Sequence, residues 1–122
     1  MPRKILLTED DPFLIDIYTT KLKESGFQVE LANNGEEAMR KLSDGQFDLL
    51  VLDLVLPHMD GWEVLRKIKS DKALRSLPVL VLSNLGQRQE VEAGLKLGAA
   101  KYLIKAHHTP SQVVEEIKKV LK

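Results

Sequence analysis

Five short apolar runs alternate with longer, more polar segments along the chain, and this alternation restricts the possible folds more than any other feature. Most of the runs are too continuously apolar to be strands with one face in water, so they are typical of strands covered on both faces. The second run alternates apolar and polar residues and is expected nearer an edge. The predicted strands are Lys4–Thr8, Phe27–Ala32, Asp48–Asp53, Pro78–Ser83 and Ala100–Ile104.

The segments between the runs begin with helix-start signals. Asp11-Pro12 and Thr109-Pro110 each place an N-cap residue before a proline at the first helical position. The spacing predicts helices over about 12–25, 34–44, 60–70, 86–97 and 109–121. A strand–helix unit repeated five times predicts a doubly wound α/β domain, with helices on both faces of a parallel sheet. No linker interrupts it, so we expect one domain over residues 1–122 and no output domain in this chain.

Composition excludes several classes of protein. The 122 residues carry 18 basic and 18 acidic side chains, which gives no electrostatic reason to expect a nucleic acid or an acidic membrane as partner. Without cysteine, the chain has no disulfides, thiol catalysis or thiolate metal site. No stretch approaches the roughly 18 apolar residues of a membrane span, and the N-terminus is unlike a signal peptide. We therefore expect a cytoplasmic domain.

Polar residues gather where the predicted parallel strands end. Glu9 and Asp10 follow the first strand, Asp53 closes the third, Ser83 closes the fourth, and Lys105 follows the fifth. In doubly wound sheets the ligand crevice lies at the carboxyl ends of the strands. We therefore expect these five side chains at one edge of the sheet.

Three carboxylates at one edge repel one another, and a cation relieves that repulsion. Carboxylate oxygens without cysteine or histidine nearby suit Mg²⁺, which keeps several waters and takes one or two protein carboxylates. A metal beside one carboxylate neutralises an incoming phosphoryl group, so that this carboxylate can attack phosphorus. Lys105 supplies a charge and Ser83 a hydroxyl for the phosphoryl oxygens. The set predicts a phosphoryl-accepting aspartate.

With these motifs in place, the chain resembles the receiver domain of two-component response regulators over essentially its whole length. The resemblance is carried by ILLTEDD, LLVLDLVLPHMDGWEVL, PVLVLSN and LGAAKYLIKA, in that order and spacing. It implies a CheY-like, flavodoxin-like (βα)5 fold with strand order 2-1-3-4-5. It also implies a signalling domain that catalyses only its own phosphorylation and dephosphorylation, rather than a turnover enzyme.

The resemblance further assigns roles to single residues. Asp53 would be phosphorylated, with Ser83 and Lys105 contacting the phosphoryl group. Mg²⁺ would be held by Glu9, Asp10, Asp53 and the backbone carbonyl of Val55. Ser83 and Tyr102 would form the switch that changes the face made by the fourth helix, fifth strand and fifth helix. The donor would be a phosphohistidine on a sensor histidine kinase or a phosphotransfer protein, and the output a target protein or a domain outside this chain.

Two positions depart from the family pattern. Ala106 follows Lys105 where the family usually has proline in a cis peptide; a cis bond before a non-proline residue costs about 2.5–4 kcal/mol, so the loop either holds that strain or is trans. Asn84 stands where the family often has alanine or glycine, and Val55 offers no polar side chain to orient water. From these two residues we expect slow loss of the phosphoryl group.

Other classes fit the residues less well, with one exception. A haloacid-dehalogenase-type phosphatase needs a second acid two residues after the nucleophile, where this chain has Val55. A flavodoxin needs a phosphate loop after the first strand, where Glu9 and Asp10 would repel phosphate. A receiver-fold module that binds partners without being phosphorylated remains an alternative, because Asn84 and Ala106 both lie at the site.

Overall fold

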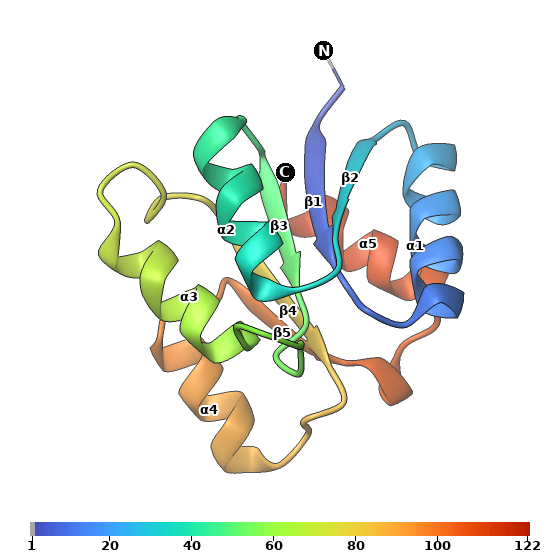
Figure 1. Ribbon diagram of the computed structural model, residues 1–122. Helices are drawn as coiled ribbons and strands as arrows, with labels where there is room; N and C mark the ends of the chain where they lie inside the picture. Colours follow the sequence, from blue (N-terminus) through green and yellow to red (C-terminus); the bar gives the residue numbers. More distant parts are fainter. Residues whose placement is uncertain (1) are drawn as a thin grey trace.

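The computed structural model describes residues 2–122 and contains five strands and five α-helices (Figure 1). The strands are β1 (Lys4–Thr8), β2 (Gln28–Ala32), β3 (Leu49–Leu52), β4 (Val79–Ser83) and β5 (Lys101–Ile104). The helices are α1 (Pro12–Glu24), α2 (Gly35–Asp44), α3 (Gly61–Ser70), α4 (Arg88–Lys96) and α5 (Pro110–Val120), and a 3₁₀ turn spans Lys105–His107.

The strands form one parallel sheet in the order β2-β1-β3-β4-β5, as the resemblance implied. The order reverses between β1 and β3, which are paired so that Thr8 lies beside Leu52. At this reversal the helices after β1 and β3 pack on opposite faces of the sheet, which is the position where doubly wound sheets bind ligands. The topology therefore brings the polar residues after β1 and β3 together.

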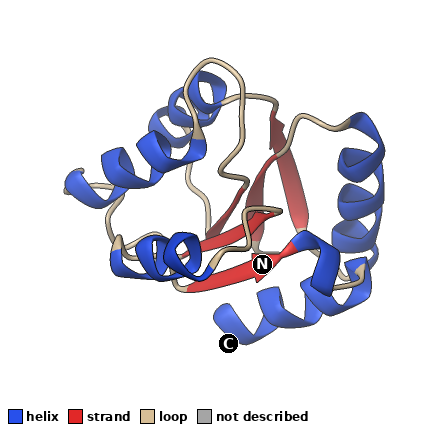
Figure 2. Ribbon diagram, turned by 90° about the horizontal axis from the view of Figure 1, so that it is seen from below, coloured by secondary structure: helices blue, strands red, loops and turns tan. Residues whose placement is uncertain are grey.

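Helices cover both faces of the sheet (Figure 2). Two apolar cores lie between these helices and the sheet. One core contains buried residues of α2 and α3 packed on alternate residues of the strands, and the other contains buried residues of α1 and α5. β3 contributes to both because all four of its residues, Leu49–Leu52, are buried. This explains its unbroken apolar sequence, since both of its faces are covered.

The local signals explain where the helices begin. The side chains of Asp11, Asn34, Asp60 and Thr109 each accept a hydrogen bond from a backbone N–H of the following helix. These bonds satisfy amide groups that have no partner within the helix. The predicted helices are confirmed, and the predicted starts at 34, 60 and 109 are the N-cap residues themselves.

The strand predictions were wrong in two details. Four strands are shorter than expected, because Phe27, Asp48, Asp53, Pro78 and Ala100 lie just outside them. β5 was expected to be covered on both faces, but it is the second edge of the sheet and only Leu103 in it is fully buried. β2 does form an edge, as its alternating sequence predicted.

Two absences hold for the part of the chain that the structure describes. Residues 2–122 contain no cis peptide bond, so Lys105–Ala106 is trans and continues into the 3₁₀ turn. Within the same range, no helix combines the length and the apolar character needed to cross a bilayer.

Candidate functional site

Asp53 directly follows the last residue of β3 and lies almost completely buried, with 5% of its surface exposed. Its backbone N–H donates to the hydroxyl of Thr8 at 3.0 Å. Its Oδ1 accepts from the backbone N–H of Val55 at 3.1 Å. Main chain and carboxylate are therefore both held at the strand end, where the sequence predicted that this acid would lie.

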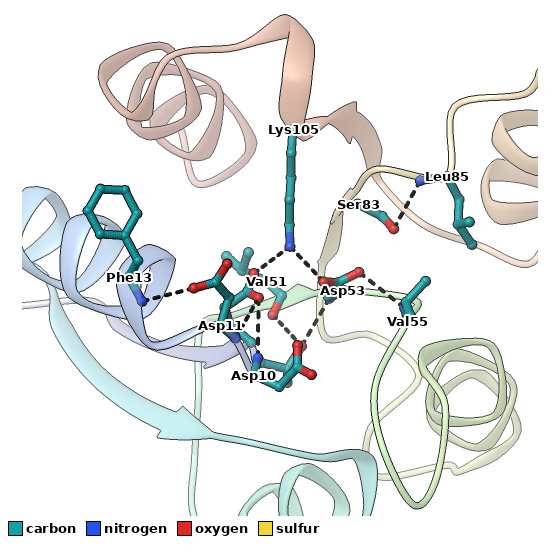
Figure 3. A network of polar contacts seen from close by, with 11 residues as sticks. Asp10, Asp11, Phe13, Val51, Asp53, Val55, Ser83, Leu85 and Lys105 are labelled. Atoms are coloured by element: carbon teal, nitrogen blue, oxygen red, sulfur yellow. Dashed lines mark hydrogen bonds and ion pairs between the residues drawn. The ribbon is translucent and has the colours of Figure 1, made fainter.

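Lys105 reaches across from the carboxyl end of β5 and places its ammonium between two buried acids (Figure 3). Nζ lies 2.7 Å from Oδ2 of Asp53 and 2.6 Å from Oε1 of Glu9. Burial alone would lower the pKa of Lys105, but the hydrogen bonds and charges of Asp53 and Glu9 outweigh burial and raise this pKa. The side chain therefore stays charged at neutral pH and compensates both carboxylates.

Glu9 is folded back over the start of α1. Its Oε2 accepts from the backbone N–H groups of Asp10 and Asp11 at 3.2 and 3.1 Å, while Oε1 holds Lys105. The side chain of Asp11 caps α1 by accepting from Phe13 at 2.9 Å (Figure 3). The neighbouring acids therefore have different positions, as predicted: Asp11 caps the helix, and Glu9 faces the site.

A divalent cation is suited to the acids at this edge. Glu9, Asp10 and Asp53 each place a carboxylate oxygen within 4.8 Å of the others, and Asp10 is exposed while the other two are buried. All the donors are hard oxygens, and the exposed carboxylate leaves one side open for metal-bound water. This chemistry fits Mg²⁺. The predicted role of the Val55 carbonyl as a metal ligand stays a prediction.

Ser83 and Tyr102 are connected through one backbone residue, Leu85. The buried hydroxyl of Ser83 accepts from the N–H of Leu85 at 3.3 Å, whereas the hydroxyl of Tyr102 donates to the carbonyl of Leu85. Ser83 makes no hydrogen bond to Asp53. Burial, together with the charges of Glu90 and Asp53, raises the pKa of Tyr102 to about 12. The tyrosine is therefore a neutral donor at physiological pH.

Two residues that support the site were missed from the sequence. Thr8 is 1% exposed, and its hydroxyl both accepts from Asp53 and donates to the carbonyl of Val51. Gly61 lies so close to the backbone of Asp53 that an added Cβ would be 2.2 Å from its carbonyl oxygen. A threonine at the end of an apolar strand resembles any β-branched strand residue, and a glycine at the first position of a helix resembles a turn residue, so neither carried a distinct signal.

Comparisons with known proteins agree with this geometry. A family model described as the response regulator receiver domain matches residues 5–118. Among curated proteins, the transcriptional regulatory protein CusR of Escherichia coli (strain K12) is 38% identical over 102 residues, which are 84% of this chain and 44% of CusR. The chain spans about half the length of the first curated relatives it matches.

Solved structures show the same likeness in three dimensions. The CheY-like receiver domain protein from Methanospirillum hungatei JF-1 has a TM-score of 0.90 at 26% identity, with 99% of this chain and 94% of that one covered. The phosphorylated cyanobacterial phytochrome response regulator RcpA has a TM-score of 0.86 at 32% identity, with 98% of this chain and 91% of that one covered.

Proposed function

This chain belongs to the response regulator receiver domain family, and we propose that its Asp53 accepts a phosphoryl group in a Mg²⁺-dependent reaction. The donor is a phosphohistidine of a sensor histidine kinase or of a phosphotransfer protein. The observation that carries the proposal is the ammonium of Lys105 between the buried carboxylates of Asp53 and Glu9, with Asp10 beside them. A module that only binds partners has no need for such a cluster.

The residues of the chain suit each part of the transfer. An oxygen of Asp53 attacks phosphorus, an O–P bond forms, and the N–P bond to the donor imidazole breaks. Lys105 already contacts Oδ2 and is placed to attract the incoming phosphoryl oxygens. Glu9, Asp10 and Asp53 would hold Mg²⁺, which neutralises phosphoryl charge when bound. Because Asp53 and Glu9 are buried, these charges act more strongly on one another than they would in water.

The signal then passes through Ser83, Leu85 and Tyr102. In this structure the hydroxyl of Ser83 is engaged by Leu85. A phosphoryl group on Asp53 offers acceptor oxygens to that hydroxyl, so Ser83 turns toward it and releases the N–H of Leu85. The carbonyl of the same residue holds Tyr102, so the change reaches β5 and then α4 and α5. The surface of α4, β5 and α5 would therefore be the face that a downstream target or an output domain outside this chain recognises.

Several finer features belong to this proposal. Function in the cytoplasm, without a nucleic-acid or membrane partner for this domain, follows from the family and the balanced charge. Val55 has no polar side chain to orient a hydrolytic water, and the exposed side chain of Asn84 narrows the entrance for water, so the phosphoryl group is lost slowly. Faster dephosphorylation in Asn84→Ala would support slow loss through crowding of the entrance, and an unchanged rate would contradict it.

The decisive experiment is intact-protein mass spectrometry after incubation with acetyl phosphate, in Mg²⁺ or in EDTA. We expect an adduct of one phosphoryl group that requires Mg²⁺ and is absent from Asp53→Asn. A matched control is Asp48→Asn, which changes the exposed aspartate at the opposite end of β3 and should leave the adduct unchanged. If the wild type forms no adduct and does not bind beryllofluoride, the phosphoryl-acceptor proposal fails and a phosphorylation-independent binding module replaces it.

A further inference from the structure

We propose that Thr8 is a positioning residue for the phosphoryl-accepting aspartate, and that its hydroxyl holds the main chain of Asp53 in the reactive position. This inference rests on the proposed function of Asp53. Thr8 itself touches neither metal nor phosphoryl group in this role; it acts through the strand end on which the acceptor lies. The hydroxyl, rather than the bulk of the side chain, is what the position requires.

The hydrogen bonds of this hydroxyl carry the inference. Oγ1 of Thr8 accepts from the N–H of Asp53 at 3.0 Å and donates to the carbonyl of Val51 at 3.0 Å. The residue is 1% exposed, so water does not reach the pair readily. A hydroxyl has one hydrogen and two lone pairs, and it can therefore serve a donor and an acceptor of the neighbouring strand together.

The location explains why a side chain is needed here. Thr8 is the last residue of β1 and pairs with Leu52, the last residue of β3. Asp53 lies one residue beyond the ladder, where the chain turns away toward α3. Its N–H is taken up by the Thr8 hydroxyl instead of by a strand carbonyl. Valine would fill the same space but would leave this N–H buried without a partner.

Losing the hydrogen bond between the Thr8 hydroxyl and the N–H of Asp53 would affect the reaction, because the reacting carboxylate is held at short distances from the other groups of the site. The carboxylate of Asp53 lies 2.7 Å from the ammonium of Lys105, and the carboxylate of Glu9 contacts the same ammonium. Displacement of a reacting group by about 1 Å can lower a rate by about 100-fold. A partial shift of the strand end predicts a smaller loss, about 10-fold, in the phosphorylation rate of Thr8→Val.

The test compares Thr8→Val with Thr8→Ser, which keeps the hydroxyl but removes a methyl group. Thr20→Val, an exposed threonine on α1, is the control. Phosphorylation rates are measured by mass spectrometry over a range of acetyl phosphate concentrations in saturating Mg²⁺. Urea unfolding at the assay temperature verifies that every variant is folded there, and amide exchange reports on the N–H of Asp53.

We expect the saturating rate to fall about 10-fold in Thr8→Val, with Thr8→Ser and Thr20→Val within about threefold of the wild type. The amide of Asp53 should exchange faster in Thr8→Val alone. Equal rates in folded Thr8→Val and wild type would overturn the positioning role and leave the proposed function intact. The same loss in Thr8→Ser as in Thr8→Val would also overturn it, because the hydroxyl would then be irrelevant. Absence of any adduct in the wild type would overturn both.

Discussion

The acidic site, defined by Glu9, Asp10, Asp53 and Lys105, and the α4 region, defined by α4 with Tyr102, meet near Leu85 but are held in different ways. In the acidic site, Glu9, Asp53 and Lys105 are buried or nearly so, and hydrogen bonds fix Asp53 at its backbone N–H and at both carboxylate oxygens.

The α4 region is much less buried. α3 buries Gly61, Val64, Leu65 and Ile68, whereas Gly94 is the single buried residue of α4. The ring of Tyr102 packs against Gly94, where a Cβ would lie 2.8 Å from a ring carbon. An open surface hollow of about 570 Å³, lined by Trp62 and Leu97 among others, lies between α3 and α4. The difference indicates a rigid acceptor joined to an element that can move at low cost.

The largest effect is expected from Lys105→Met, which removes the cation shared by Glu9 and Asp53. Two buried carboxylates would then face each other without compensation, and breaking a buried ion pair in this way costs about 3–5 kcal/mol. Urea unfolding in EDTA should show this loss in the free energy of unfolding, and saturating Mg²⁺ should recover part of it. Lys119→Met, which removes an ion pair at the surface, is the control and should leave stability close to that of the wild type. A loss below 1 kcal/mol for Lys105→Met would show that the site is not held by this cation.

Gly61→Ala should be the next most damaging change, because the new methyl group meets backbone atoms. A Cβ there would lie 2.2 Å from the carbonyl oxygen of Asp53 and 2.5 Å from Cα of Leu54. Overpacking of this kind costs about 1–3 kcal/mol, and relief requires movement of the strand end that carries the acceptor. Unfolding curves and acetyl phosphate labelling should both be affected. Normal labelling in a destabilised variant would indicate that the loop shifts without moving Asp53.

Hydrogen exchange tests whether the α4 region is the more mobile of the two regions. We expect the amides of α4 to exchange through local openings that cost at least about 2 kcal/mol less than those of β1 and β3, because α4 buries almost no side chain. Exchange of residues 91–96 should be compared with that of 64–68 in α3, which is similar in length but well packed. Equal protection in the two helices would contradict the idea that α4 is the mobile element.

Gly94→Ala should have a small net effect although its Cβ would also meet a close neighbour, the ring of Tyr102 at 2.8 Å. Alanine favours the helix over glycine by about 1 kcal/mol, and both the ring and a loosely held α4 can move aside. We expect the free energy of unfolding to change by less than about 1 kcal/mol. Circular dichroism during urea unfolding measures it. A loss as large as that of Gly61→Ala would show that α4 is as rigid as the acidic site.

Sequence reasoning reached most of the fold because its signals are local. The N-caps at Asp11, Asn34, Asp60 and Thr109 act within a few residues, and strand periodicity depends only on neighbours. The meeting of Glu9, Asp53 and Lys105 was also accessible, because the carboxyl ends of parallel strands share one edge.

The features that the sequence did not predict depend on contacts between segments that are distant along the chain. Thr8 is a good strand residue with or without its bond to Asp53, 45 positions away. From the sequence, Gly94 is only a helix-weakening residue inside the helix predicted over 86–97, whereas its close contact with the Tyr102 ring comes from packing between α4 and β5. The trans peptide before Ala106 depends on the loop as a whole, so one residue type left both forms open. These features are contacts that fix how the elements lie relative to one another, so they cannot be read from any one short segment of the sequence.

The smallest expected effect concerns the pH dependence of Tyr102, which links the two regions. Its pKa is raised from 10.0 to about 12, so the folded state holds the proton more tightly than the unfolded state does. The stabilisation is complete below pH 10 and is lost as the pH rises through about 12. Because the ring is partly exposed, we expect this stabilisation to stay below about 1 kcal/mol. In Tyr18→Phe, Tyr102 is the remaining tyrosine, and phenolate absorbance should appear near pH 12 while circular dichroism shows a folded chain. A midpoint near 10 in the folded chain would mean that Tyr102 is solvated, and that its link through Leu85 to Ser83 is too weak to couple α4 to the acidic site.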